Sequence, residues 1–264
     1  SPTLFERPVI KMGPYLFQLP WVVAMQNNAV AAINNLRRLG SRRPGARNET
    51  QRIETRLARC FQNRGFRVQL NYQPARTALE DPGEVDLICA RDGDVLVLEV
   101  KSTFLRLSFR DAWLHGTTTL RKAGLQLQRK TAAVHHALGT DAELAETLGI
   151  ESGRTPPSPH AWIVDTSIEW NHGRFSGFLK ISLEELLIAL RDDAHLLNDP
   201  GRLFSGNWMK EKHGVEEDLA PSSTLYPDGF SFSRLVEVIE NQTVWHELPP
   251  PESYPHRRDP PGPR

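Results

Sequence analysis

Two apolar runs flank a charged turn in the first half of the chain. Val85–Ala90 and Val95–Val100 are almost entirely apolar, and Asp92-Gly93 lies between them. An Asp-Gly pair between two such runs is one of the strongest short signals for a β-hairpin. Both strand faces are apolar near the turn, which is typical of strands covered on both sides. The pattern predicts a hairpin at the centre of a sheet.

Within the two strands, charged residues lie only at the end away from the charged turn. With Asp92 and Gly93 at the turn centre, Asp86 lies opposite Glu99, and Lys101 projects from the same sheet face. Two carboxylates in opposite positions repel each other. A divalent cation held by oxygen ligands would offset that repulsion. The sequence therefore predicts a metal-dependent hydrolytic site at this end.

A helix is expected on each side of the hairpin in the sequence. In the first helix, Glu54 lies at the edge of the apolar stripe. In the second, Gln126 and Lys130 lie on one flank, one turn apart. The buried stripe of that second helix comprises Leu120, Ala123, Leu127, Thr131, Val134 and Leu138. From these positions, Glu54 and Gln126 could be functional-site residues or ordinary solvent-exposed residues.

The hairpin signature resembles that of the PD-(D/E)xK nuclease superfamily. That signature places an acidic residue on one strand and Glu-x-Lys on the next, here Asp86 and Glu99-Val100-Lys101. The proline of the nominal motif is displaced to Pro82, a loss that is common in the superfamily. The resemblance covers residues 48 to 168 in outline.

The resemblance also implies a fold and two further site residues. The family carries a glutamate on the helix before the hairpin and often a glutamine on the helix after it, for which Glu54 and Gln126 are the candidates. The implied fold class is α/β. Its restriction-endonuclease-like core is a mixed central sheet flanked by helices, in the order αβββαβ. N-terminal helical and C-terminal extensions are expected around it.

The chemistry implied by the resemblance is phosphodiester hydrolysis with Mg²⁺, for which Mn²⁺ can substitute. The expected metal ligands are Asp86, Glu99 and the Val100 carbonyl. Lys101 would orient or deprotonate the attacking water, or stabilise the phosphorane. Glu54 would position that water or join the shell of a second metal, and Gln126 would bind the nucleic-acid backbone or fix Lys101.

A structural interpretation of the hairpin stands beside the catalytic one. Asp86 and Glu99 could be ordinary charges at a strand end, with Lys101 as their ion-pair partner. Charged clusters at the end of a covered sheet are more often functional sites than ordinary surface charges, so we favour the catalytic interpretation.

The net charge of zero conceals an asymmetry. Residues 1–76 hold thirteen Lys or Arg against three acids, and the rest of the chain is correspondingly acidic. Arginine suits bidentate contacts with phosphate. The candidates for nucleic-acid contact are Arg42, Arg43, Arg47 and Arg52. The alternative is that this basic segment docks on the acidic half of the same chain.

Composition favours a cytoplasmic protein. No apolar run reaches the roughly 20 residues that a membrane span needs, so no membrane partner is expected. The two cysteines, Cys60 and Cys89, lie in apolar surroundings and suggest reduced thiols. Because the chain begins with Ser1, we also consider it a candidate piece of a longer protein, in which a partner domain or subunit selects the target.

Four segments are expected along the chain. They are a basic helical extension (1–47), the nuclease-like core (48–181), a mostly helical or irregular extension (182–248) and a disordered proline-rich tail (249–264). Core strands are predicted at Arg67–Tyr72, His160–Asp165 and Phe175–Ile181, and a short helix at Phe232–Asn241. Trp162 and Trp170 are expected to lie in the core or to cover the sheet rather than to stack with nucleic-acid bases.

The function that we expect from the sequence is a metal-dependent nuclease acting on DNA. A catalytically silent nucleic-acid-binding or scaffold protein on the same fold is one alternative, and an RNA-directed nuclease is another. A metal-dependent hydrolase with a different substrate is disfavoured by the arginine-rich segment.

Overall fold

The computed structural model describes residues 9–24, 46–75, 81–102, 106, 108–151, 157–197 and 224–246. The chain divides into two compact units, 1–184 and 185–264, which are treated separately below. Within the described residues, none of the helices combines the length and the apolar character that crossing a membrane requires.

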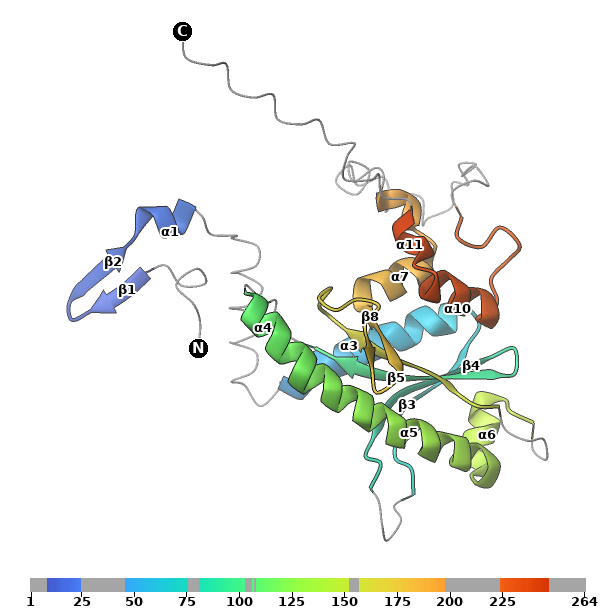
Figure 1. The fold of residues 1–264 in the computed structure, drawn as a ribbon. Coiled ribbons are helices and arrows are strands. Elements are labelled where there is room, and N and C mark those ends of the chain that lie inside the picture. The colour runs from blue at the N-terminus through green and yellow to red at the C-terminus, as the bar shows by residue number, and fades with distance from the viewer. Residues whose placement is uncertain are drawn as a thin grey trace. The chain divides into compact units, whose positions relative to one another are not determined.

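The first unit is built on a mixed six-stranded sheet (Figure 1). Its strands are β3 (Arg67–Tyr72), β4 (Val85–Arg91), β5 (Asp94–Lys101), β6 (His160–Asp165), β7 (Arg174–Phe175) and β8 (Phe178–Ser182). They are arranged in the order β3-β4-β5-β6-β8-β7. The pairs β3·β4, β4·β5 and β7·β8 are antiparallel, whereas β5·β6 and β6·β8 are parallel. The predicted α/β class and mixed central sheet are confirmed.

The central hairpin has the predicted register. Asp92 and Gly93 both have positive φ angles, 56° and 86°, as a two-residue type I′ turn requires. Arg91 pairs with Asp94 and Cys89 with Leu96, and the ladder runs to Leu87 opposite Leu98. Continuing this register by one residue beyond the last pair places Asp86 opposite Glu99. The strands are buried on both faces, as the apolar pattern indicated.

Helices cover both faces of this sheet (Figure 1). Helix α3 (Ala46–Asn63) packs against β3, β4 and β5. On the other face lies a nearly continuous helical segment of α4 (Phe109–Leu114), the π-helical turn η1 (His115–Leu120) and α5 (Arg121–Thr140), followed by α6 (Ala142–Leu148). The predicted stripe of α5 is buried, apart from Thr131, which is half-buried. The predicted order of one helix, three strands, helix and strand is confirmed.

Close packing fixes α5 on the sheet at one glycine. A Cβ atom at Gly124 would lie 2.4 Å from the backbone oxygen of Phe175, at the end of β7. Only a residue without a side chain allows the helix and the strand to approach this closely.

The strand predicted at Phe175–Ile181 is wrong in one respect. A turn at Ser176 and Gly177, with φ angles of 51° and 89°, divides it into β7 and β8. The apolar residues on either side belong to a tight antiparallel hairpin, because both turn residues adopt left-handed conformations that reverse the chain.

The N-terminal segment differs from the helical extension that was expected for residues 1–47. Strands β1 (Val9–Met12) and β2 (Tyr15–Gln18) form a separate two-stranded sheet, followed by the short helix α1 (Pro20–Ala24). Gly13, with φ of 60°, lies at the turn between the strands. Residues 1–8 and 25–45 of this predicted extension lie outside the described residues.

The second unit is helical in its described part. It contains most of α7 (Leu183–Arg191), then η2 (Ala194–Leu197), α10 (Phe232–Glu240) and α11 (Thr243–His246). Within it, the Tyr226 hydroxyl donates to the Ala189 carbonyl over 2.8 Å. The predicted helix near Phe232–Asn241 is confirmed. The predicted proline-rich tail lies outside the described residues.

Candidate functional site

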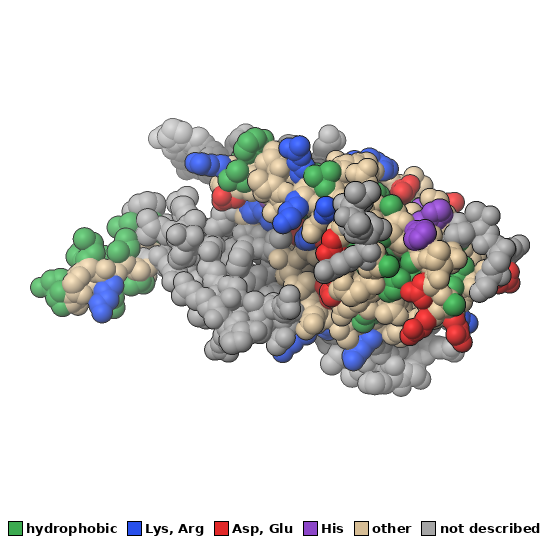
Figure 2. Space-filling view, turned by 90° about the horizontal axis from the view of Figure 1, so that it is seen from below, with side chains coloured by type: hydrophobic (Ala, Val, Ile, Leu, Met, Phe, Trp, Pro, Cys, Tyr) green, Lys and Arg blue, Asp and Glu red, His purple; other side chains and the backbone are tan. Residues whose placement is uncertain are grey.

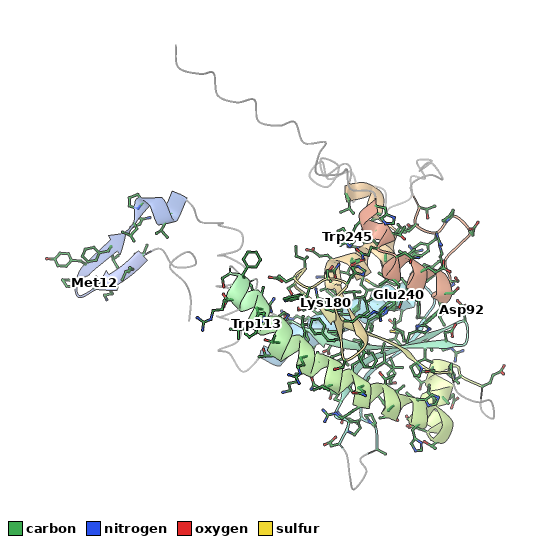
Figure 3. All side chains as sticks on the ribbon, viewed as in Figure 1. Met12, Asp92, Trp113, Lys180, Glu240 and Trp245 are labelled. Atoms are coloured by element: carbon green, nitrogen blue, oxygen red, sulfur yellow. The ribbon has the colours of Figure 1, made fainter. Side chains whose placement is uncertain are left out.

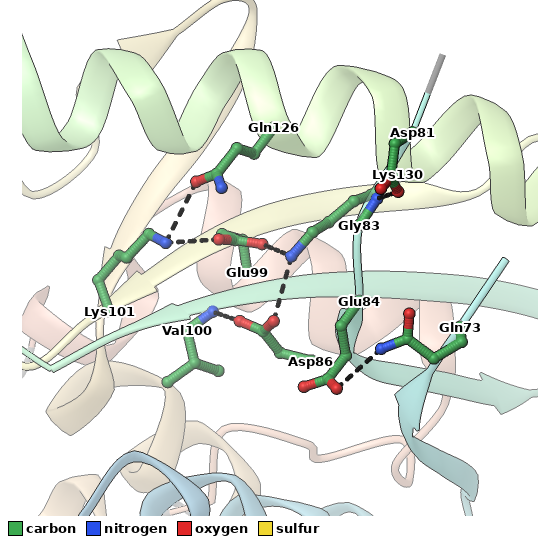
Figure 4. Close-up of polar contacts among 10 residues, drawn as sticks. All are labelled: Gln73, Asp81, Gly83, Glu84, Asp86, Glu99, Val100, Lys101, Gln126 and Lys130. Atoms are coloured by element: carbon green, nitrogen blue, oxygen red, sulfur yellow. Dashed lines mark hydrogen bonds and ion pairs between the residues drawn. The ribbon is translucent and has the colours of Figure 1, made fainter. Parts of the chain in front are cut away.

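A chain of alternating charges lies at the end of the central hairpin (Figure 4). The Lys101 Nζ donates to Gln126 Oε1 over 3.3 Å and to Glu99 Oε1 over 2.5 Å. The other oxygen of Glu99 accepts from the Nζ of Lys130. Lys130 also donates to Asp86 Oδ1 over 3.1 Å. The structure therefore brings Asp86, Glu99, Lys101 and Gln126 together, as the sequence predicted.

The backbone fixes the Asp86 carboxylate. Its second oxygen accepts from the backbone N–H of Val100 over 2.7 Å, so the strand that carries Glu99 also holds Asp86. All four carboxylate oxygens of Asp86 and Glu99 therefore have donors, which stabilises two acids that would otherwise repel each other.

Lys130 is the site residue that the sequence did not single out. Its side chain is only 5% exposed and its Nζ lies between the two carboxylates. Burial alone would lower the pKa of Lys130, but Glu99 and Asp86 outweigh burial and raise it. A signal existed, because Lys130 follows Gln126 by one turn on the same helix flank.

Burial raises the pKa of Asp86, and the neighbouring Glu99 raises it further. Lys130 and the Val100 N–H act in the opposite direction but do not outweigh them. A carboxyl group with this perturbation at the end of a covered sheet is a candidate for function.

Glu54 projects from α3 toward the same end of the sheet and is buried. Burial raises its pKa from 4.5 to about 7, and the negative charges of Asp86 and Glu84 contribute to the rise. These charges act on Glu54 because they are near it, so the structure brings this predicted residue to the cluster.

The raised pKa of Glu54 makes the free energy of unfolding depend on pH. Ionising Glu54 is harder in the folded protein than in the unfolded chain. The contribution of the protonated Glu54 to the free energy of unfolding is therefore complete below the unfolded pKa of 4.5, and it is lost as pH rises to about 7. At about pH 8 in EDTA, Glu54→Gln should be more stable than the wild type by up to about 3 kcal/mol, since one pKa unit is about 1.4 kcal/mol. Near pH 4 the gain should vanish.

Urea unfolding at both pH values measures this effect. Glu146→Gln is the matched control, because Glu146 is exposed on a helix of the same unit. An equal gain for Glu54→Gln at acid and alkaline pH would contradict the prediction.

Of the four arginines predicted to bind nucleic acid, the structure describes the side chain of Arg52 alone. Arg42 and Arg43 lie outside the described residues, and only the backbone of Arg47 is described. Arg52 is exposed on α3, but at 100° per residue it points about 160° away from Glu54. On the face seen in Figure 2, side chains of both charges lie interspersed among the described residues. Nucleic-acid contact by these arginines stays a prediction.

A second buried polar cluster lies beside the site and was not predicted. Asp165 pairs with Lys101 in the parallel ladder of β5 and β6. One of its oxygens contacts His115 Nε2 at 2.7 Å and accepts from the Ser167 hydroxyl at 2.7 Å. The Lys101 carbonyl accepts from Thr166 N–H over 3.0 Å. This network fixes the backbone of Lys101, and no sequence spacing reveals it because His115 lies in a π-helical turn.

The chemistry of the two carboxylates suits a magnesium ion. They converge on a single cationic nitrogen, so their oxygens point to one position. Mg²⁺ prefers oxygen ligands and is often held by one or two carboxylates, with water and substrate phosphates completing its shell. Among the described residues, no group of three or more acidic, histidine or cysteine side chains forms a metal site. Asp86 and Glu99 would hold the ion, and the Lys130 ammonium would have to move aside.

The Val100 carbonyl stays a prediction as a third metal ligand. The Val100 N–H donates to Asp86, and the residue pairs with Val164 in the parallel ladder of β5 and β6.

Comparison of the sequence with protein-family models and with curated proteins finds no match.

Proposed function

We propose that this protein is a metal-dependent nuclease with a core of the PD-(D/E)xK, restriction-endonuclease-like type, and that its substrate is DNA. The observation that carries this proposal is the convergence of Asp86 and Glu99 on one cation, with Lys101 bound to Glu99. The order of one helix, three strands, helix and strand supports the same class.

Each side chain has a role in this proposal. Asp86 and Glu99 hold Mg²⁺, which, when bound, lowers the pKa of a water molecule and stabilises charge on the scissile phosphate. The Lys101 Nζ donates a hydrogen bond to a non-bridging oxygen of that phosphate. Gln126 keeps Lys101 in position through its Oε1 atom.

Glu54 is the candidate proton acceptor. A general base works best when its pKa is close to the operating pH, and the pKa of Glu54 is raised to about 7. Its carboxylate would take the proton of the attacking water.

One observation favours the alternative of a silent nucleic-acid-binding or scaffold protein. Lys130 bridges both carboxylates and Lys101 pairs with Glu99, so two ammonium groups balance two carboxylates without a metal. In that case the lysine would replace the metal permanently, and the fold would serve binding only.

Cleavage assays decide between the two functions. Supercoiled plasmid, single-stranded DNA and RNA are incubated with Mg²⁺ or Mn²⁺, and with EDTA instead. We expect metal-dependent cleavage of DNA. The cleavage rate should fall about a hundredfold or more in Lys101→Ala, because removing one hydrogen-bond donor positioned at the developing charge of a transition state costs about that factor. Lys122→Ala is the matched control, because Lys122 is a lysine of α5 whose side chain is exposed to solvent.

The other outcomes are equally informative. Cleavage of RNA alone would assign the RNA-directed alternative. Nucleic-acid binding with no cleavage under any metal condition would favour the scaffold, and cleavage that persists in EDTA would exclude the metal-dependent mechanism.

A further inference from the structure

A hollow lies in the first unit, at the start of the long helical segment. Its volume is about 400 Å³, within the range of about 300–1,000 Å³ typical of ligand sites. Trp113, Gly116 and Arg121 line it from the helical side, and Trp170, Arg174 and Phe175 line it from the segment before β8. Figure 3 marks Trp113 on α4.

Trp170 is held rigidly at this hollow. Its indole N–H donates to the Ala112 carbonyl over 2.8 Å. A Cβ atom at Gly116 would lie 3.0 Å from the indole nitrogen, so the missing side chain leaves room for the ring. Trp170 also has a φ of 59°, a left-handed conformation that is unusual for a bulky residue and often marks functional positions.

Both indoles are nevertheless accessible. Trp170 is 47% exposed and Trp113 is 57% exposed, which differs from the expectation that Trp170 lies in the core or covers the sheet. Trp162, in contrast, is buried as expected. The two exposed indoles line one hollow together, and contiguous exposed apolar patches often mark interaction sites.

The charge of the hollow is positive. Arg121 and Arg174 line it, and among its lining residues there is no aspartate or glutamate. Arg121 is exposed, and no ion pair joins it to any residue that the structure describes. The lining therefore combines flat aromatic surfaces with guanidinium groups suited to phosphate.

We propose that this hollow binds unpaired nucleotides of a single-stranded nucleic acid, with bases stacked on Trp113 and Trp170 and phosphates bound by Arg121 and Arg174. Bases in a duplex are already stacked on one another, so exposed indoles select single strands. The inference rests on the proposed nuclease function and adds the class of substrate, which is single-stranded nucleic acid. Arg121 precedes Gln126 of the candidate site by about 7.5 Å along the helix axis.

Binding measurements in EDTA test the hollow apart from any cleavage. The probes are a short oligothymidylate, an oligouridylate of equal length and a DNA duplex, and the readouts are tryptophan fluorescence and a titration by anisotropy. We expect the single strands to quench the fluorescence, and Trp113→Ala to bind them roughly tenfold more weakly, since one stacked base is worth about that factor. Trp113→Phe should recover most of the affinity.

The arginine contribution is tested in the same way. Arg121→Ala should weaken binding and lower its dependence on salt, because one phosphate contact is lost. Lys122→Ala removes the same charge from the same turn, and Leu125→Ala truncates an exposed hydrophobic residue of the same helix outside the hollow. Both controls should bind like the wild type.

Each result has one meaning. Binding of either oligonucleotide that depends on Trp113 supports the proposal, even if no metal condition gives cleavage and the nuclease function fails. Unchanged affinity in Trp113→Ala and Arg121→Ala, or equal quenching by the duplex, would overturn the proposal even if the protein cleaves DNA.

Discussion

Asp86→Asn is expected to lower metal-dependent DNA cleavage by about a thousandfold or more. The substitution keeps the shape of the side chain but removes half of the carboxylate pair that would hold the metal. Metal stabilisation of a transition state is worth several kcal/mol, and each 1.4 kcal/mol is about tenfold in rate. Single-turnover cleavage of a labelled substrate with Mg²⁺ measures this loss directly.

Glu146→Gln is the matched control for Asp86→Asn. Glu146 is an exposed carboxylate on α6, outside the carboxylate pair. The control variant should keep most of the activity. If Asp86→Asn cleaved as fast as Glu146→Gln, while both proteins were folded, the assignment of the site would be wrong.

Lys130→Met is expected to destabilise the metal-free protein by about 3–5 kcal/mol, the usual loss when one partner of a buried ion pair is removed. The raised pKa of Lys130 lies above its ordinary value of 10.5, so the stabilisation by its charge is fully present at neutral pH and is lost only as pH rises through the folded pKa. Without this ammonium, Asp86 and Glu99 repel each other. The deficit should therefore be larger at mildly alkaline pH than at acid pH, where protonation relieves the repulsion.

Magnesium should reverse much of this loss. An ion that binds only the folded state stabilises it by mass action, and in Lys130→Met it meets no competing ammonium. Thermal unfolding with Mg²⁺ and with EDTA should show a larger shift in Tm for Lys130→Met than for the wild type. Lys122→Met is the exposed control, and an equal shift in all three proteins would show that Lys130 and the metal do not share a position.

The central part of the fold could be predicted because its signals are local. The turn at Asp92-Gly93 and the two-residue period of β4 and β5 define the register, and the register alone sets Asp86 opposite Glu99. Gln126 and Glu54 followed from helix periodicity together with the family resemblance. These inferences depend on neighbouring residues along the chain, where geometry is nearly independent of the rest of the fold.

The features that were missed depend on distant contacts. From the sequence, a lysine on a helix flank is expected to be exposed to solvent. Lys130 is buried because the fold brings it to two carboxylates that lie 31 and 44 residues away in the sequence. The contact between His115 and Asp165 spans 50 residues and requires a π-helical turn. The turn at Ser176-Gly177 did have a local signal, because a Ser-Gly pair favours a turn, but the apolar residues on both sides were interpreted as one strand.

The tight contact at Gly124 determines how a metal could enter the site. Helix α5 cannot slide or roll toward β7 without driving its backbone into the carbonyl group of Phe175. Lys130 and Gln126 are therefore carried on a helix that cannot move closer to this part of the sheet. In the proposed mechanism, exchange of the ammonium for a metal ion would be a change of rotamer of the long, unbranched Lys130 side chain, with no shift of the helix toward β7.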